Sequence, residues 1–466
     1  MTRFNTKTPP QRNIAGGIAY KESDEMQLVS LLLTSFGDDK YYQTANEVFK
    51  SLETLIQKCD SHFTAQAIIF ARKVFGMRSI SHIASSMLAK YIGGDEWASL
   101  FFDKVIVRPD DMTEIIACHL NRKQKITNAM KKGFARAIGR FDEYQLAKYR
   151  GEGKGVKLVD VVNICHPVQT EKNNGAIEKL VNGTLKSFDT WEVELSAAGS
   201  DTEKKKEAWN RLFDEHKLGY FALLRNLRNI LSLNDAILKN KALYVLTNEK
   251  AIKASMVLPF RFSTAYEEMR KIGAIEAMRQ VSRACEISCK NVPKLSGKTL
   301  VALDVSGSMC GRPSQIGSLF AAVLAKSNDV DVMTFDDRAR YVVFNPDDSL
   351  MTIKSSFRFT GGGTNFNSVF ATANKRYDRI ILLSDMQSWD NSCWYGDARK
   401  GIKAYRGAWN PSCKFYSFDL EGYGTLSIPE HDTYCLAGFS DKIFDIMANL
   451  EVDKHALINR VKEIEL

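Results

Sequence analysis

Oxygen-bearing side chains follow three apolar or glycine-rich segments of this sequence. Asp304, Ser306 and Ser308 come at the end of "LVALDVSGS", Thr364 lies in "TGGGTNF", and Asp385 ends "ILLSD". Alternation in an extended turn points Asp304 and the two serines the same way. Carboxylates and hydroxyls are hard ligands that suit Mg²⁺ or a similar ion, and water or a partner's carboxylate would complete the coordination. We therefore predict a divalent metal, Mg²⁺, at these five residues.

A simpler explanation is that Ser306 and Ser308 cap the next helix and that Asp385 only ends a strand. We favour the metal because the three segments, in this order, resemble the metal-ion-dependent adhesion site of von Willebrand factor A domains. No suitably placed histidine, cysteine or Lys–Ser pair stands beside the motif, and the sequence has no phosphate-loop or zinc signature. We expect a metal that holds a carboxylate rather than activates water, and hence a protein that is not an enzyme.

Positive charge is concentrated in one short segment. The chain has 64 Lys and Arg against 55 Asp and Glu, yet residues 121–157 alone hold 11 basic and three acidic residues. Such a block attracts polyanions, nucleic acid above all, unless it is only a solvated helix face. His166 follows at a helix end, where it can contact a nucleotide or simply interact with the helix dipole. The candidate contacts are Arg122, Lys123, Lys125, Lys131, Lys132, Arg136, Arg140, Lys148, Arg150, Lys154 and His166.

A second polar group interrupts the apolar helix "YFALLRNLRNIL". Arg225, Asn226, Arg228 and Asn229 form hydrogen bonds between helical repeats or contact a ligand, and the sequence leaves both interpretations open.

The pattern of apolar residues divides the chain in two. From about residue 24 to 290, apolar residues recur at i, i+3, i+4 and i+7, which predicts helix after helix and favours an α-solenoid of HEAT-like repeats. Asp110 and Thr113 are expected as N-caps of "MTEIIACHL". Beyond residue 298, β-branched runs alternate with helical segments, typical of a mostly parallel sheet covered on both faces. We predict domains at 1–294 and 295–466.

The strands expected in the second domain span 299–305, 329–335, 340–344, 379–385, 412–420 and 432–437, and the helices span 314–327, 365–377, 396–408 and 441–450. In such folds a ligand site lies beyond the carboxyl ends of the strands, where Asp304 and Asp385 are expected.

The apolar runs and the cysteines of the sequence indicate the cellular compartment of the protein. No run of 18 apolar residues predicts a transmembrane helix, and the first residues lack the apolar core of a secretory signal. Nine scattered cysteines without a CxxC pair favour reduced thiols in a cytoplasmic protein.

The chain as a whole resembles the Ro autoantigen (TROVE-domain) family. The resemblance rests on "KYRGEGKG…LVDVVNICHP", "FALLRNLRNIL", "LVALDVSGSM", "TGGGTNF" and "LLSDMQ", and on the order of a helical domain before a von Willebrand A domain. It implies a ring of HEAT-like repeats closed by the Rossmann-like A domain, with a basic central hole. It also implies that Lys148, Arg150 and His166 contact RNA at the hole.

The resemblance further implies the partners. We expect structured or misfolded non-coding RNA, with single-stranded 3′ ends in the hole and Y-RNA-like stems on the outer surface, in RNA quality control or ribonucleoprotein assembly. An exoribonuclease or another protein would bind at the A domain, no membrane is involved, and the protein is expected to be a monomer. The alternative is a metal-dependent protein-interaction scaffold that binds no RNA; a metal-dependent hydrolase is a weaker rival, because no general base can be named.

Overall fold

Two compact units make up the chain. The computed structural model describes residues 10–36, 39–186, 195, 198–255, 257, 259–288, 294–345, 347–388, 398–429, 433–438, 443, 446–447, 453 and 455–466. The helical unit consists of residues 22–188 and 455–466, and the sheet unit consists of residues 1–21 and 189–454. None of the helices in the described ranges is long and apolar enough to cross a membrane.

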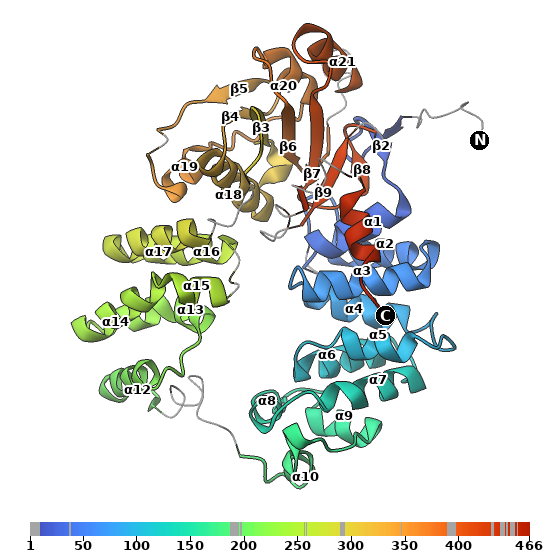
Figure 1. Ribbon diagram of the computed structural model, residues 1–466, viewed down its shortest axis with the longest axis vertical. Coiled ribbons are helices and arrows are strands. Elements are labelled where there is room, and N and C mark those ends of the chain that lie inside the picture. Colours follow the sequence, from blue (N-terminus) through green and yellow to red (C-terminus); the bar gives the residue numbers. More distant parts are fainter. Residues whose placement is uncertain are drawn as a thin grey trace. The chain divides into compact units, whose positions relative to one another are not determined.

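The helical unit is a stack of paired helices, as the apolar periodicity predicts (Figure 1). One layer contains α1, α3, α5 and α7, each packed on the next, and the other contains α2, α4, α6 and α9. The helices are α1 (Asp24–Thr34), α2 (Ala45–Lys58), α3 (Ser61–Lys73), α4 (Ser79–Leu88), α5 (Ala98–Lys104), α6 (Pro109–Asn121), α7 (Asn128–Ile138), α8 (Glu143–Lys148), α9 (Leu158–Cys165), the 3₁₀ turn Glu171–Asn173, α10 (Ala176–Val181) and α23 (Ala456–Lys462).

Local sequence explains where these helices begin and which face they bury. In α2, Val48, Leu52, Leu55 and Ile56 are buried on one face, and the side chain of Thr44 caps the helix by accepting from the backbone N–H of Glu47. Ser23, Asp60, Thr127 and Asp142 cap α1, α3, α7 and α8 in the same way.

The predicted caps of α6 are wrong. This helix begins at Pro109, so Asp110 and Thr113 lie inside its first turns. Proline at the first helical position suits the helix, because it has no N–H to leave unpaired and its φ is already helical.

The C-terminal segment completes the helical unit. Helix α23 packs on α3, and the side-chain amide of Gln66 donates to the backbone oxygens of Lys462 and Ile464. The ammonium group of Lys462 lies 2.9 Å from the Glu25 carboxylate. The last residues therefore belong to the fold formed by residues 22–188 rather than to the sheet.

A six-stranded sheet organises the other unit, and all six expected strands are present. The strand order is β5-β4-β3-β6-β7-β9, parallel except for the antiparallel edge strand β5. Central β3 is buried along its whole length, which explains its continuous apolar run. The strands are β3 (Thr299–Asp304), β4 (Val330–Phe335), β5 (Ala339–Val342), β6 (Arg379–Ser384), β7 (Lys414–Asp419) and β9 (Tyr434–Ala437).

Helices cover both faces of this sheet. In β7, Phe418 stacks on Phe320 of α18 (Arg312–Ser327), while Phe415 contacts Phe370 of α20 (Phe366–Thr372) and Tyr405 of α21 (Ala398–Ala408). Residues 415 and 418 point to opposite sides of a strand, so α18 lies on one face and α20 and α21 on the other. Helix α19 (Leu350–Ser356) packs beside α18, and the expected helix at 441–450 lies largely outside the described residues.

Further helices belong to the sheet unit, namely α12 (Thr202–Asp214), α13 (Tyr220–Leu231), α14 (Ala236–Leu246), α15 (Glu249–Ser255), α16 (Pro259–Lys271) and α17 (Ile275–Ser288). Helix α16 packs on α18, and Glu286 of α17 accepts a hydrogen bond from the N–H of Leu350. The change from helices to strands falls between α17 and β3, near the predicted boundary at 294. The boundary between the two compact units lies earlier in the chain, between residues 188 and 189.

The N-terminal residues add a small second sheet to this unit. Strands β1 (Gln11–Arg12), β2 (Ile18–Lys21) and β8 (Thr425–Leu426) pair in the order β1-β2-β8. The Asn13 side-chain amide donates to the Ser388 carbonyl at 2.8 Å, and Ser388 Oγ donates to the Ile18 carbonyl at 3.1 Å. The chain start is thereby fixed to the loop that follows β6.

Gly17 allows this close approach, because a Cβ atom added there would lie 2.2 Å from the Ser388 carbonyl oxygen. We expect Gly17→Ala to lower the free energy of unfolding of the sheet unit by about 1–3 kcal/mol, as overpacking does. Gly407→Ala is the matched control, since a Cβ at this helical position meets nothing within 4 Å, and it should be neutral or stabilise by up to about 1 kcal/mol. Urea unfolding measures both; equal stability of the two variants would contradict the role of Gly17.

Candidate functional site

Neighbouring strand ends bring the predicted metal ligands together. Asp304 is the last residue of β3, and Asp385 directly follows β6, its parallel neighbour in the sheet. Both carboxylates are fully buried. Parallel strands present their carboxyl ends at one edge of a sheet, so Asp304 and Asp385 meet there although they are far apart in the sequence.

Hydroxyl groups surround Asp304. Ser384 Oγ donates to Asp304 Oδ2 at 2.6 Å, and the backbone N–H of Ser306 donates to Asp304 Oδ1 at 2.9 Å. The hydroxyl oxygens of Ser306 and Ser308 lie 3.3 Å apart, and both serines are buried. The side chain of Ser306 also hydrogen-bonds Asp304, and that of Ser308 hydrogen-bonds Asp385, so the turn after β3 directs both serines toward the two carboxylates.

The glycine-rich loop packs against the same turn. The N–H of Gly307 donates to the Gly362 carbonyl at 3.1 Å, and the N–H of Gly361 donates to the Val305 carbonyl at 3.2 Å. Thr364, two residues beyond Gly362, is buried. All three predicted segments thus meet at one end of the sheet.

The electrostatics of this site favour a cation. Burial raises the pKa of Asp304 to about 6, and the charge of Asp336 adds to the shift. Burial and the charge of Asp304 raise the pKa of Asp385 well above its ordinary value. Asp385 Oδ2 is buried and has no hydrogen-bond partner within the described residues. Two adjacent buried carboxylates, one with an unused oxygen, and neighbouring hydroxyls form a donor set that fits Mg²⁺.

Sequence reasoning missed three residues at this edge. Ser384 bonds Asp304 directly, and the charges of Asp336 and Asp419 act on Asp304 and Asp385, respectively. Each stands at the end of a predicted strand, so the strand-end rule could have found them. The described residues contain no group of three or more His, Cys, Asp or Glu arranged to hold a metal.

The basic candidates in the helical unit fall into two groups. Those of the first group are held by neighbours. The pairs are Arg122 with Glu53, Arg136 with the Ser99 hydroxyl, Arg140 with Asp103, Arg150 with Glu152, and Lys154 with Glu114. Those of the second group make no ion pair or side-chain hydrogen bond within the described part of the chain; they are Lys123, Lys125, Lys131, Lys132, Lys148 and His166.

Lys131 and His166, two members of the second group, lie where α7 meets α9. Lys131 and Lys132 lie near the start of α7, and Lys123 and Lys125 lie in the loop before it. The charge of Lys131 acts on Cys165, whose pKa burial raises to about 12, so this part of α7 faces the C-terminal end of α9. His166 follows Cys165 as the C-cap of α9, in a left-handed conformation. We call Lys123, Lys125, Lys131, Lys132 and His166 the α7–α9 edge.

Lys148 and Arg150 lie at the opposite end of α9. The Arg150 carbonyl accepts from the N–H of Leu158, the first residue of α9. The eight residues of α9 span about 12 Å at 1.5 Å per residue. The structure therefore does not bring Lys148 and Arg150 to the same point as His166, and a ligand that contacts all three must extend along α9.

The buried carboxylate of Asp111 connects helices α3, α4 and α6. Asp111 of α6 accepts from Arg72 of α3 at 2.8 Å, lies 2.8 Å from His82 Nε2 of α4, and also accepts from the backbone N–H groups of Val107 and Arg108. Hydrogen bonds and charges from His82 and Arg72 outweigh burial and hold the pKa of Asp111 well below its ordinary value.

Asp110 extends the network to the surface. It pairs with Arg78 and Arg108, and the guanidinium of Arg108 stands 4.4 Å from the ring centroid of Tyr149. Lys148 also lies over this ring. Tyr149 was not among the sequence candidates, although its place between Lys148 and Arg150 is a signal for base stacking among phosphate contacts.

The fold and the sites define a protein with an α-helical repeat region and a doubly covered, mostly parallel sheet of the von Willebrand A kind. The chain is similar over 94% of its length to the crystal structure of the Deinococcus radiodurans RO (RSR) protein, of which the match covers 99%, with a TM-score of 0.60 and 17% identity. At this identity the similarity concerns the fold.

The sequence comparisons are shorter. Residues 182–301 match the TROVE domain model. Over 91 residues the chain is 36% identical to mouse telomerase protein component 1 and 34% identical to the rat protein, which is 19% of this chain and 3% of either relative. The TROVE model thus matches one part of the chain, and the whole-chain similarity shows the fold; both agree with the resemblance of the sequence motifs to the Ro/TROVE family.

Asp111 provides a test of the helical unit. We expect Asp111→Asn to lower the free energy of unfolding at neutral pH by about 3–5 kcal/mol, because it leaves the Arg72 charge buried without its partner. Glu114→Gln, which breaks the exposed pair with Lys154, is the control and should cost at most about 1 kcal/mol.

The pH dependence follows from the lowered pKa of Asp111. Such a group stabilises the folded state above its ordinary pKa and loses that contribution as the pH falls through its lower folded value. The stability difference between wild type and Asp111→Asn should therefore shrink below about pH 4. A difference that is small at pH 7, or that grows in acid, would contradict this account.

Proposed function

We propose that this protein binds RNA through the basic face of its helical unit. The TROVE match and the Ro-type fold support RNA binding in general. The finer proposal is that the ligands are structured or misfolded non-coding RNAs with a single-stranded 3′ end, or Y-RNA-like stems, in RNA quality control or ribonucleoprotein assembly. We further propose that the protein acts as a cytoplasmic monomer and is not an enzyme; the ring with a central hole stays a prediction.

The observation that carries this proposal is positive charge without protein counterions. Within the described residues, the lysines of the α7–α9 edge and Lys148 have no carboxylate partner, while nearby arginines are held by acids. Phosphate groups release counterions when they meet such lysines, so affinity should depend steeply on salt. Tyr149, beside Lys148, adds a ring on which a base can stack.

For the sheet unit we propose a divalent metal, Mg²⁺, held by Asp304, Ser306, Ser308, Thr364 and Asp385. The support is the pair of buried carboxylates, their raised pKa values and the unused oxygen of Asp385. When bound, such an ion supplies a Lewis-acidic position for a carboxylate. The chain's own residues fix the donor oxygens and exclude water from them. A protein partner such as an exoribonuclease would provide the carboxylate.

The metal site also supports the alternative function, a metal-dependent interaction scaffold without RNA. The two functions differ in their response to conditions. Binding that involves six phosphates should lose roughly a thousandfold in affinity between 50 and 200 mM salt, whereas a metal-bridged carboxylate contact should disappear with a chelator. A hydrolase would require turnover of RNA or phosphate esters that Asp304→Ala abolishes.

The RNA proposal predicts how charge removal acts. We expect Lys131→Gln with Lys132→Gln to reduce the slope of log affinity against log salt by about 1.4 for single-stranded RNA, about 0.7 for each lost contact. Lys179→Gln is the matched control, because Lys179 pairs with Glu143 in the same unit and should leave the slope unchanged. Filter-binding titrations with a 3′-tailed RNA measure both; an unchanged slope in the double variant would count against the α7–α9 edge.

The metal proposal predicts a thermal shift. At a hundredfold excess over its dissociation constant, Mg²⁺ should stabilise the sheet unit by about 2.7 kcal/mol, and Asp304→Ala should abolish this shift. Asp347→Ala removes an exposed acid of the same unit and should retain it. Calorimetry with and without Mg²⁺ measures the stabilisation of each variant. A thermal shift with Mg²⁺ that persists in Asp304→Ala would place the ion elsewhere.

A further inference from the structure

A second basic pocket lies in the sheet unit, between α13 and α16. Its volume is about 490 Å³, within the range of small-ligand sites. The lining includes the side chains of Phe221, Arg225, Arg228, Arg261 and Glu268. None of these residues belongs to the metal site or to the basic segment of the helical unit.

Charge in this pocket is mainly positive. Among the described residues that line it Glu268 is the only acid, and it pairs with Arg228 at 2.8 Å and with Lys271 at 2.7 Å. Burial lowers the pKa of the Arg261 guanidinium, and the charges of Arg225 and Arg312 lower it further. Arginines that lower one another's pKa form a region of positive potential, which an anion would stabilise.

The structure also separates the two interpretations of the "LLRNLRN" motif. Asn226 is buried, its amide donates to the Ala222 carbonyl of the same helix, and the Asn229 amide donates to Asn226 Oδ1. The asparagines thus form hydrogen bonds within α13 rather than between helices. Arg225 and Arg228 are exposed and line the pocket, and Arg228 also forms a contact between helices through its ion pair with Glu268 of α16.

An aromatic ring stands beside this charge. Phe221 is 44% exposed, and the Arg261 guanidinium lies 5.4 Å from its ring centroid. Phosphate recognition by forked guanidinium groups together with stacking on a ring or an arginine plane is how proteins hold unpaired nucleotides. A peptide of acidic residues alone, such as polyglutamate, would use the charges but has no aromatic group to stack on the exposed ring.

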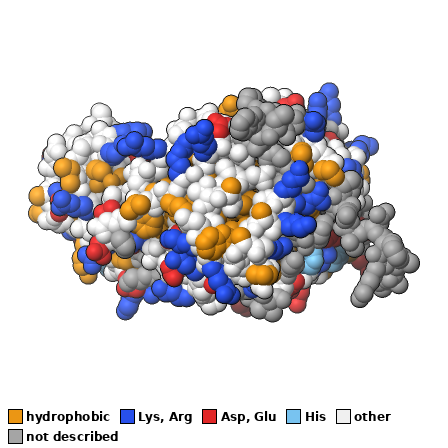
Figure 2. Space-filling view, turned by 90° about the horizontal axis from the view of Figure 1, so that it is seen from above, with side chains coloured by type: hydrophobic (Ala, Val, Ile, Leu, Met, Phe, Trp, Pro, Cys, Tyr) orange, Lys and Arg blue, Asp and Glu red, His pale blue; other side chains and the backbone are white. Residues whose placement is uncertain are grey.

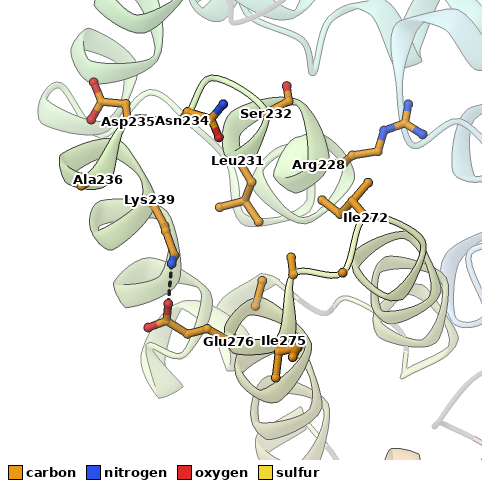
Figure 3. A pocket seen from close by; sticks show the side chains of 13 residues that line it. Arg228, Leu231, Ser232, Asn234, Asp235, Ala236, Lys239, Ile272, Ile275 and Glu276 are labelled. Carbon is orange, nitrogen blue, oxygen red and sulfur yellow. Dashed lines mark ion pairs between the residues drawn. The ribbon is translucent and has the colours of Figure 1, made fainter.

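A neighbouring pocket at the C-terminal end of α13, which shares Arg228, provides a contrast (Figure 3). It is larger, about 610 Å³, but its charges balance, because its lining holds two basic residues, Arg228 and Lys239, and two acids, Asp235 and Glu276, of which Lys239 and Glu276 form an ion pair. Its surface carries apolar side chains such as Ile272 and Ile275. Charge and the exposed ring therefore single out the pocket between α13 and α16.

We propose that this pocket binds one nucleotide of a single-stranded RNA, with its phosphate at Arg225 and Arg261 and its base on Phe221. The inference rests on the proposed RNA-binding function and adds a contact site outside the basic segment 121–157. It gives Phe221 and Arg225 separable roles, since stacking contributes affinity with little salt dependence and a phosphate contact contributes to the salt slope.

The test uses the full-length protein and a short single-stranded oligouridylate, with affinity measured by fluorescence anisotropy over a salt series. Phe221→Ala should weaken binding about fivefold to a hundredfold with an unchanged salt slope. Arg225→Gln should weaken binding and reduce the slope by about 0.7, whereas Arg225→Lys should restore the slope. Lys239→Gln, in the neighbouring pocket, is the control and should bind like wild type. Thermal unfolding verifies that each variant is folded.

The outcomes distinguish this inference from the function on which it rests. If Phe221→Ala and Arg225→Gln bind like wild type while the Lys131/Lys132 variant binds more weakly, the pocket proposal is wrong and the RNA function stands. If the wild type binds no RNA, both are wrong. Binding of polyglutamate that depends on Arg225, with RNA binding unaffected, would overturn the proposal in favour of an acidic protein partner.

Discussion

The helical unit depends on one buried carboxylate. Asp111 joins α3, α4 and α6 through Arg72, His82 and two backbone N–H groups, in a part of the structure from which water is excluded. A buried charge with good partners fixes geometry even where its net contribution to stability is modest, because each partner left alone is costly. Asp110 continues the network to Arg108, whose guanidinium faces Tyr149. The position of residues 148–150 thus depends on Asp110 and Asp111 inside the helix stack.

The buried carboxylates of the sheet unit have different partners and different pKa shifts. The hydrogen bonds to Asp304 come from hydroxyl and N–H groups, and the pKa values of Asp304 and Asp385 rise, whereas that of Asp111 falls beside Arg72 and His82. The cost of burying charge is met by protein cations around Asp111, whereas we propose an external cation for Asp304 and Asp385. On the surface of the helical unit we propose the reverse: lysines without an acid partner among the described residues bind the phosphates of RNA.

Much of this could be predicted from the sequence because the decisive signals are local. The β-branched runs that became β3 and β6 are continuous, and parallel strand ends meet by geometry, which places Asp304 beside Asp385 without knowledge of the intervening chain. Helix periodicity likewise predicted the stack. The pairing of β2 with β8 was not predictable, since two-residue contacts over about 400 positions leave no periodic pattern. Nor could sequence show that α9 separates Lys148 from His166, or that Asp110 binds arginines instead of capping a helix.

The central claim is that RNA lies along the basic face of the helical unit. Ultraviolet crosslinking of the full-length protein to a single-stranded RNA, followed by mass spectrometric identification of the crosslinked peptides, tests it most directly. The account predicts crosslinks in peptides that cover the α7–α9 edge and Tyr149, reduced at high salt and unaffected by chelator. Crosslinks confined to peptides outside residues 119–166, or none at all under conditions in which the protein is folded, would contradict it.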